Sequence, residues 1–578
     1  MSHSRWWGGV GLALLLAHAP APAQADRIRV RVEGVSGDLR RNVLARLTIQ
    51  RTDGAVSEGT IRHLVERAPK EIDEALQPFG FYRSNVRSNL TRDGDQWTAR
   101  LEIDPGPVVK VDTVDVRVLG PGERDAAFRR IVNRFPLRVG DPLHHNDYLR
   151  GKEALVRRGT RAGYLDARFD VAEVRVDLDR YAAAVHLHYE TGPRFRFGDV
   201  NIEQDILDPE LAHDFIHIRR GDPFDYGRLL QTQEDLLASP YWKGAEITPR
   251  RDLAESLDVP IDVKLTPHEP RRLVWALGYG TDDGVAATMG FEMRRLNRSG
   301  HRLGFDGQYG QIGRSATVHY HIPWANPVTD EIAFAVGGAD ERPVTSVTQR
   351  VFAATTLRRQ LGDWTRTLGL AYEIHRFPFG AGDRTSRFLA PSVVWTFLRT
   401  DPRVVPAWGS RLDLDVRGAS KQVLSNASFL RADARAKWIS TPVHRTRLLL
   451  RGEVGTTWAP DFAPLSPSLR FFAGGGQSVR GFAYRSLGPR DSTGAVIGGP
   501  HLIVGSVEVD RRVLRNWLVA AFYDIGSALF RRGDPAEDAA GVGLRWISPL
   551  GPIRLDVAMP LHEPGRKVHL HVGMGPDL

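Results

Sequence analysis

From residue 271 onward, apolar residues alternate with small or polar ones. Leu273, Trp275 and Leu277 share one face of the first such segment, with Ala276 and Gly278 on the other. The same alternation runs through residues 541–546, 553–558 and 568–575. Period-two alternation broken by turn residues predicts β-strands whose two faces meet different surroundings.

About sixteen such segments, at roughly 19 residues per strand and connection, fit residues 271–578 if 460–500 is one long loop. An apolar outer face with a small or polar inner face is typical of a transmembrane barrel. Closure removes unpaired sheet edges, which lipid does not tolerate. We therefore predict a sixteen-stranded antiparallel β-barrel over 271–578. A soluble β-sandwich is the alternative, although its hairpins do not require so many strands.

Residues 26–270 carry a different pattern, with apolar residues at helical spacing and an internal repeat. Gly140-Asp141-Pro142 recurs 81 positions later as Gly221-Asp222-Pro223. The same shift relates the apolar positions of two predicted helices, which pair as Leu149 with Leu230, Leu155 with Leu236, and Val156 with Leu237. Together, the three pairs predict one apolar stripe on the helix of each of these two repeats.

Each repeat continues through an aromatic turn into a strand pair, which gives the order β-α-α-β-β. The turns at 79–82, 162–165 and 240–244 are interpreted as core contacts rather than binding sites. The three predicted α/β repeats span 26–107, 108–193 and 194–270. An open sheet edge in such a unit can accept an extended peptide as an extra strand.

Residues 1–25 resemble a secretory signal peptide, with Arg5, an apolar run and Ala23-Gln24-Ala25 at the cleavage site. An ordinary buried helix or an uncleaved anchor is the alternative. The chain has a net charge of +9 and no cysteine. Its basic residues are scattered among acidic ones, which argues against nucleic-acid binding.

No catalytic or metal-binding pattern stands out. Gly476-Gln477-Ser478-Val479-Arg480 misses the last glycine of a nucleophile elbow and lies in a predicted loop. The histidine pairs 186/188 and 569/571 lack further ligands nearby in sequence and are interpreted as ordinary strand residues. We expect no enzyme activity, no cofactor and no metal.

The long loop contains Val479-Arg480-Gly481-Phe482, and later strands carry Glu508 and Asp524 on their predicted inner faces. A loop that folds into the barrel would bring Arg480 against these two carboxylates. Guanidinium suits this position because its planar fork binds carboxylates in a bidentate manner. The pair is expected to anchor the loop, to act as a conformational switch, or both.

These motifs resemble the BamA/TamA superfamily of outer-membrane assembly factors. The loop motif is similar to the superfamily's V-R-G-F/Y, and Phe522-Tyr523-Asp524-Ile525-Gly526 is similar to its F-x-D-x-G. Three repeats of the POTRA kind resemble the TamA branch. The resemblance implies an outer-membrane barrel with periplasmic repeats, unfolded outer-membrane proteins such as autotransporters as clients, and a TamB-like inner-membrane-anchored partner.

We expect the first and last barrel strands to meet at a weak seam that opens to admit a client strand. The predicted seam residues are Leu273, Trp275, Leu277, Leu570, Val572, Gly573 and Gly575. Gly573 and Gly575 bring no side chain to the junction, and Pro576 has no N–H to donate. A dedicated secretion channel or a passive pore is the alternative function.

Overall fold

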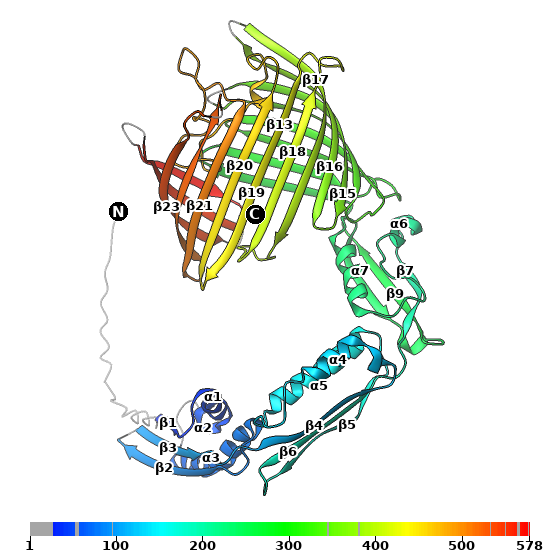
Figure 1. Cartoon of the computed structure of the whole chain (residues 1–578), viewed down its shortest axis with the longest axis vertical. Helices are drawn as coiled ribbons and strands as arrows, with labels where there is room; N and C mark the ends of the chain where they lie inside the picture. The colour runs from blue at the N-terminus through cyan, green and yellow to red at the C-terminus, as the bar shows by residue number, and fades with distance from the viewer. Residues whose placement is uncertain are drawn as a thin grey trace, which may run out of the picture. The chain divides into compact units, whose positions relative to one another are not determined.

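The computed structural model describes residues 27–51, 57–94, 96–343, 346–379, 382–531, 533–548, 551–562, 567–575 and 577. The predicted signal peptide lies outside them. The described residues form three three-stranded sheets and one sheet of sixteen strands (Figure 1). The fold class predicted from the sequence, small α/β repeats followed by a sixteen-stranded antiparallel barrel, is confirmed.

In the first repeat the central strand pairs in parallel with the strand that opens the repeat and antiparallel with the other. Its elements are β1 (Arg27–Glu33), α1 (Gly37–Arg46), α2 (Thr48–Arg51), α3 (Glu58–Leu76), η1 (Gln77–Phe79), β2 (Asn85–Asp93) and β3 (Gln96–Asp104). The short helix α2 is an addition to the predicted order. Helix α3 begins where the Ser57 hydroxyl accepts the Thr60 N–H at 3.3 Å, and its buried face carries Ile61, Leu64 and Ile72.

The second and third repeats have the predicted order β-α-α-β-β. The second contains β4 (Lys110–Leu119), η2 (Pro121–Arg124), α4 (Ala126–Asn133), α5 (His145–Arg161), β5 (Arg168–Asp177) and β6 (Ala182–Glu190). The third contains β7 (Arg196–Glu203), α6 (Pro209–His213), α7 (Tyr226–Ala238), β8 (Trp242–Pro249), η3 (Arg251–Leu253) and β9 (Asp258–Pro267). The sheet orders β4-β6-β5 and β7-β9-β8 match β1-β3-β2 of the first repeat.

The repeated helix positions divide between core and surface. Leu155 and Leu236 are fully buried. The other members of the predicted stripes, Leu149, Val156, Leu230 and Leu237, are exposed by 42 to 58%. These four positions therefore lie away from the core-facing side of their helices. The reason is geometric, because residues six apart on a helix lie about 120° from each other around its axis.

Two of the three aromatic turns contribute clearly to the cores. Tyr164 and Tyr241 are nearly buried, and Trp242 is completely so. Tyr241 also donates its hydroxyl to the carbonyl of Gly300, in the turn between β11 and β12 of the barrel, at 2.5 Å. This aromatic turn therefore joins the core of the third repeat to the first part of the barrel.

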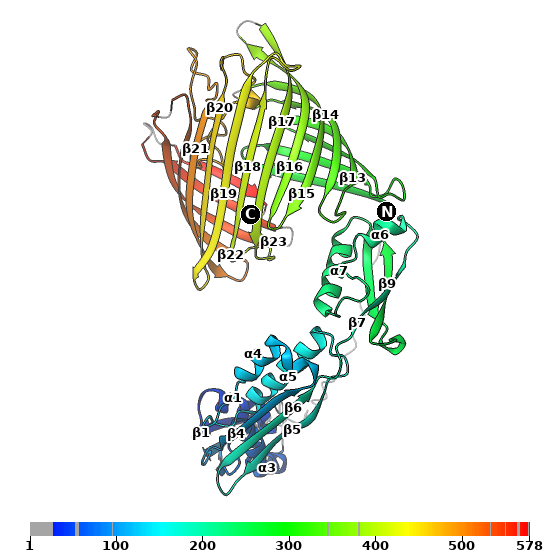
Figure 2. The same cartoon turned by 45° about the vertical axis from the view of Figure 1, so that its right-hand side comes forward.

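The barrel wall consists of strands paired antiparallel in chain order (Figures 1 and 2). Its first eight strands are β10 (Arg271–Gly280), β11 (Gly284–Met293), β12 (Arg302–Gly310), β13 (Gly313–Pro323), β14 (Glu331–Glu341), β15 (Thr348–Leu361), β16 (Trp364–Phe379) and β17 (Gly382–Thr400). The others are β18 (Gly409–Ala419), β19 (Phe429–Val443), β20 (Thr446–Trp458), β21 (His501–Leu514), β22 (Trp517–Leu529), β23 (Glu537–Ser548), β24 (Gly551–Pro560) and β25 (His569–Met574).

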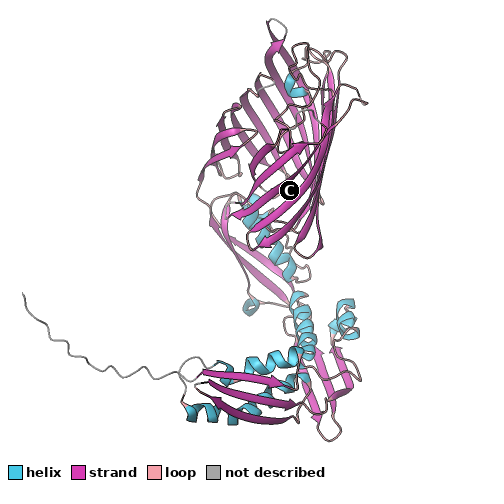
Figure 3. Ribbon diagram, turned by 90° about the vertical axis from the view of Figure 1, so that its left-hand side faces the viewer, coloured by secondary structure: helices cyan, strands magenta, loops and turns pink. Residues whose placement is uncertain are grey.

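Along these strands, exposed and buried side chains alternate as predicted for the outer and inner faces of the wall. On β22, Tyr523 and Ile525 are about 40% exposed, whereas Phe522 and Asp524 between them are buried. Figure 3 shows most of the helix in the N-terminal repeats and the barrel wall as strand. No helix within the described part of the chain is long and apolar enough to cross a membrane.

Candidate functional site: the inner loop and the barrel seam

The loop between β20 and β21, residues 459–500, packs on the inner face of the barrel wall. Val479 is fully buried and Phe482 nearly so, and both belong to one apolar cluster with wall residues. The wall members of that cluster are Leu502, Val504, Ala528 and Ala539. Gly481, at φ +93°, passes so close to the wall that an added Cβ would lie 2.8 Å from that of Ala539. Apolar burial and a positive φ thus fix the path of the motif.

Arg480 is the ionic centre of this contact. Its guanidinium donates to both carboxylate oxygens of Asp524, at 2.7 and 2.9 Å, and to Glu508 at 2.6 Å. Its backbone N–H also donates to Asp524, at 3.0 Å. The guanidinium carbon lies 3.4 Å from the centre of the Phe522 ring. Because Arg480 is 5% exposed and Asp524 0% exposed, the pair is shielded from water and each partner depends on the other.

The network extends beyond the two predicted carboxylates. Arg545 on β23 donates to Glu508 at 2.9 Å and also hydrogen-bonds Asp556 on β24. Asp556 lies 3.4 Å from Arg480. Arg451 on β20 lies 3.9 Å from Asp524. Three arginines therefore face three carboxylates, which balances the charge of the cluster without an added ion.

The Arg451 side chain also binds the backbone of the loop. Its guanidinium donates to the carbonyl oxygens of Gln477 and Ser478, at 2.7 and 2.5 Å. The loop backbone before the motif is thereby tied to β20, while the Arg480 side chain is tied to β21, β22 and β24. The loop therefore connects four strands of the wall from the inside: β20, β21, β22 and β24.

The wall is weakest where its first and last strands meet. All sixteen strands form a ladder with their neighbours in chain order, but no described ladder pairing joins β10 to β25. Two hydrogen bonds connect Thr281, directly after β10, with Val572: Thr281 N–H to the Val572 carbonyl at 3.3 Å, and Val572 N–H to the Thr281 hydroxyl at 3.2 Å. β25 has 6 residues and β10 has 10. Much of the β10 edge therefore has no partner in the described chain.

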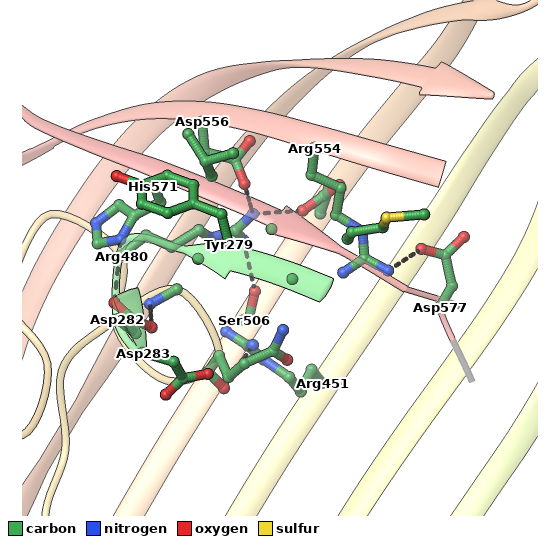
Figure 4. A pocket seen from close by; sticks show the side chains of 18 of the residues that line it. Tyr279, Asp282, Asp283, Arg451, Arg480, Ser506, Arg554, Asp556, His571 and Asp577 are labelled. Carbon is green, nitrogen blue, oxygen red and sulfur yellow. Dashed lines mark hydrogen bonds and ion pairs between the residues drawn. The ribbon is translucent and has the colours of Figure 1, made fainter. Parts of the chain in front are cut away.

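The loop contacts both sides of this seam. The Gly476 N–H donates to Asp282, in the turn after β10, at 2.6 Å. The Gly481 N–H donates to Nε2 of His571 on β25, at 3.0 Å. Figure 4 shows Asp282, Arg480 and His571 close together around the pocket that lines the seam from inside. Seam and loop are therefore one structural unit.

The predicted site residues have distinct positions in this unit. Val479, Arg480, Gly481 and Phe482 lie against the wall, with Glu508 and Asp524 beside Arg480. Of the predicted seam residues, Val572 makes the hydrogen bonds across the junction, whereas Leu273, Trp275 and Leu277 are 55 to 86% exposed. Leu570 and Gly573 lie within β25, but Gly575 lies beyond its end, so the strand prediction was one residue too long there.

Sequence reasoning missed several members of the site. Arg545 and Asp556 are two of many inward-facing charges, and only strand register selects them. His571, interpreted from the sequence as an ordinary strand residue, accepts a hydrogen bond from the loop. Asp282 is a turn residue whose role depends on where the loop lies. Alternation placed Arg545 and Asp556 on the inner face, and that was the only available signal for them.

Comparison with known proteins agrees with this architecture. Residues 296–577 match the Omp85 superfamily domain, and residues 29–105 match the first POTRA domain of TamA. The crystal structure of BamA from Haemophilus ducreyi lacking POTRA domains 1–3 covers 80% of this chain and 98% of its own, with a TM-score of 0.65 and 16% identity. That likeness concerns the fold.

Two sequence relatives are outer membrane protein assembly factors BamA. The one from Nitratidesulfovibrio vulgaris is 24% identical over 390 residues, which is 62% of this chain and 47% of that protein. The one from Neorickettsia risticii is 29% identical over 152 residues, 24% of this chain and 20% of that protein. The chain thus spans about half the length of the first relative and about a fifth of the length of the second. With an Omp85 barrel domain behind a TamA-type POTRA domain, the chain belongs to the BamA/TamA superfamily, with its barrel in the outer membrane and its POTRA repeats in the periplasm.

Proposed function

We propose that this protein assembles or translocates other outer-membrane proteins by pairing a client strand with the free edge of β10. The observation that carries the proposal is that no ladder joins β10 to β25 among the residues that the structure describes. Unpaired backbone N–H and C=O groups at a sheet edge are a template for an added strand. In lipid this template is stronger, because an unpaired backbone group costs several kcal/mol there.

The energy needed to part the seam is modest. Four described hydrogen bonds hold it: two between Thr281 and Val572, one from Gly476 to Asp282 and one from Gly481 to His571. At about 1 kcal/mol net for each bond, losing the two direct bonds and one of the two loop bonds costs about 3 kcal/mol. A client strand that pairs along the 10 residues of β10 would form more bonds than are lost. Opening is therefore favoured when a client strand is present.

The loop gives the proposed seam a closed state. Because Gly476 and Gly481 bond opposite sides of the junction, opening requires the loop to release one side. Arg480 keeps the loop attached to β21 and β22 during this step. By this proposal, the role of the arginine cluster is to hold the loop ready for reclosure while the edge is free.

The periplasmic repeats would deliver clients to this edge. Each sheet has two outer strands, of which β4 and β7 are bridged on their outer side at Pro142 and Pro223, and extended client segments would add along the remaining edges. The exposed apolar positions of α5 and α7 offer helix faces as a competing contact. Autotransporters are our proposed client class. A TamB-like inner-membrane-anchored protein is our proposed partner at the first repeat.

A disulfide lock tests the proposal. The protein contains no cysteine, so Thr281→Cys with Val572→Cys introduces a single bridge across the seam. Full-length protein in lipid vesicles should lose insertion of a urea-unfolded outer-membrane barrel protein on oxidation, and regain it on reduction. The matched control is Val318→Cys with Val336→Cys, a pair in the closed β13–β14 ladder, which should insert the client in both redox states.

Undiminished insertion by the oxidised seam variant would contradict the proposal. High steady conductance of the vesicles, unchanged by the seam bridge and accompanied by no client insertion, would favour a passive pore instead.

A further inference from the structure

Three turns at the periplasmic end of the barrel surround a strongly basic pocket. β10 follows the third repeat directly in the chain, so β10 begins at the end of the barrel to which the repeats are attached. Because neighbouring strands are antiparallel, the turns after β17, β19 and β21 lie at that same end. They border a cavity of about 650 Å³, the rim pocket. The basic residues that line it are Arg403, His444, Arg445, Arg447, Arg512 and Arg515, and none of the described lining residues is acidic.

Two of the five arginines already have carboxylate partners. Arg403 donates to both carboxylate oxygens of Asp401, at 2.9 and 2.7 Å. Arg447 donates to both carboxylate oxygens of the buried Asp510. Each of these two guanidinium charges is therefore balanced by a neighbouring residue of the barrel, and neither is available for a ligand.

The other three arginines, Arg445, Arg512 and Arg515, are exposed and form no ion pair with a described acidic residue. The one side-chain hydrogen bond described for them runs from the Arg512 guanidinium to the Arg515 carbonyl, at 3.5 Å. A cleft lined by one sign of charge attracts ligands of the opposite sign and raises their local concentration. The rim pocket therefore has the chemistry of an anion site with three unpaired guanidinium groups.

Contacts within the chain hold the three turns together. The Arg512 N–H donates to the Arg445 carbonyl at 2.9 Å, which joins the end of β21 to the turn after β19. Arg445 has φ +62°, as a tight two-residue turn between β19 and β20 requires. The Thr441 hydroxyl donates to the Ala407 carbonyl at 2.6 Å, which joins β19 to the turn after β17. The backbone that carries the three arginines is therefore positioned in advance, which lowers the cost of binding.

The rim pocket lies on the lumen side of the wall. Arg512 pairs across the ladder with Leu518, which is 2% exposed, and so continues the inner face of β21. Arg447 pairs with Asp510 on the same face. Lipid headgroups lie outside the wall, whereas a polypeptide at the mouth of the barrel meets these side chains directly. Apolar side chains beside the arginines suit a segment with both acidic and apolar residues, and they are Val405, Val513, Leu514 and Leu518.

We propose that the rim pocket is a docking site for an acidic segment of another polypeptide in the periplasm, whose carboxylates pair with Arg445, Arg512 and Arg515. Guanidinium suits this role because it binds carboxylates in a bidentate manner. The pocket volume falls within the range of about 300–1,000 Å³ that is typical of ligand sites. The rim pocket shares no lining residue with the pocket at the seam, so this inference does not depend on the proposed function.

The test measures binding of a defined peptide to the full-length protein in phosphatidylcholine nanodiscs. The probe is a nine-residue peptide with glutamate at every third position and alanine and leucine between. Its partner carries glutamine in place of glutamate, and both peptides carry the same dye and are blocked at their ends. Fluorescence anisotropy gives each Kd, and a photoreactive residue at Leu514 reports whether the peptide lies at the rim pocket.

The rim variant combines Arg445→Gln, Arg512→Gln and Arg515→Gln. It should bind the glutamate peptide at least about tenfold more weakly than the unmodified protein does, because three solvent-exposed charge pairs are lost together. The glutamine peptide should bind both proteins equally weakly. Added salt should weaken binding of the glutamate peptide to the unmodified protein, since salt screens exposed charges.

The control variant makes the same change in net charge at the opposite end of the barrel. It combines Arg384→Gln, Arg490→Gln and Arg531→Gln, at three exposed residues near the connections after β16, β20 and β22. Its Kd for the glutamate peptide should be unchanged. Heat-modifiable migration in gels shows whether each variant has a folded barrel. If the rim variant does not fold, Arg515→Gln alone replaces it and should weaken binding about two- to threefold.

Equal affinity of the rim variant and the unmodified protein for the glutamate peptide would overturn the proposal. Equal affinity of the unmodified protein for the two peptides would also overturn it, as would binding without any adduct at Leu514. A lipid headgroup is the competing occupant. If the unmodified protein retains phosphatidylglycerol in native mass spectrometry and the rim variant loses it, while both bind the peptide alike, the pocket takes a lipid and the peptide proposal is wrong.

Discussion

Replacing Arg480 by alanine removes the side-chain ion pairs between the inner loop and the wall. The substitution deletes the bidentate bond to Asp524, the bond to Glu508 and the contact with the Phe522 ring. Glu508 keeps Arg545 as a partner. Asp524 keeps the backbone N–H of residue 480 at 3.0 Å, the Ser506 hydroxyl at 2.6 Å and Arg451 at 3.9 Å. Most of the lost free energy therefore arises at Asp524, a buried carboxylate that loses its bidentate partner.

The expected magnitude follows from these remaining contacts. Removing one partner of a buried ion pair typically costs about 3–5 kcal/mol. Because Asp524 retains a hydroxyl and a nearby arginine, we expect the lower end, about 3 kcal/mol for the attachment of the loop. That corresponds to a roughly 100-fold larger population of the detached loop. The barrel wall itself should still form, since its strand ladders do not involve Arg480.

Limited proteolysis measures this population. When opening is fast relative to cleavage, the cleavage rate follows the open fraction, so proteinase K should cut near residues 483–485 about 100-fold faster in Arg480→Ala. The cleavage rate of Arg480→Lys should lie between those of Arg480→Ala and the unmodified protein, because one ammonium cannot replace the planar guanidinium. Arg490→Ala is the matched control, since the described bonds of Arg490 go to carbonyls of its own loop.

A double variant separates charge from fold damage. Adding Asp524→Asn to Arg480→Ala removes the orphaned carboxylate and should restore part of the protection. The reasoning would be refuted if Arg480→Ala were cleaved within twofold of the unmodified rate. It would also be refuted if Asp524→Asn made the Arg480→Ala variant less protected still.

Two further predictions concern the repeats. Burial raises the pKa of Tyr241 to about 12 from its ordinary 10.0. The stability that the neutral hydroxyl contributes is therefore complete below pH 10 and is lost between pH 10 and about 12. Tyr241→Phe should make the unfolding midpoint nearly independent of pH over that range, and an unchanged pH dependence of the midpoint would disprove the assignment. An added Cβ at Gly151 of α5 would lie 2.2 Å from the Phe135 ring, so Gly151→Ala should destabilise the second repeat by about 1–3 kcal/mol in urea unfolding followed by helical circular dichroism. Gly59→Ala in α3, where no heavy atom lies within 4 Å, should be neutral or stabilising by up to about 1 kcal/mol, and equal effects of the two substitutions would show the clash to be unimportant.

The barrel could be predicted because lipid and lumen impose opposite demands on alternate residues. Val507 and Val509 lie outside and Ser506 and Glu508 inside for that reason, and period two is visible in the sequence. The position of Arg480 beside Glu508 and Asp524 required only the assumption that the loop turns inward, together with the chemistry of guanidinium. Local residue types carried enough information for that step.

The remaining contacts depend on distances that the sequence does not encode locally. His571 becomes a loop acceptor only because β25 ends beside Gly481. The rim pocket depends on how the turns after β17, β19 and β21 lie beside one another. The exposed Leu149 and Leu230 belong to the same apolar pattern as the buried Leu155 and Leu236. Spacing alone does not say which face of an apolar helix the sheet covers.

The central claim is that a client strand pairs with β10, and site-specific photocrosslinking during assembly tests it most directly. A photoreactive residue at Ala276 on β10 is compared with one at Ala335 on β14, a central strand paired on both sides, while an unfolded barrel protein is inserted. The account predicts client adducts at Ala276 that appear during insertion and disappear on completion, and none at Ala335. Equal adducts at both positions, or successful insertion without any adduct at Ala276, would contradict it.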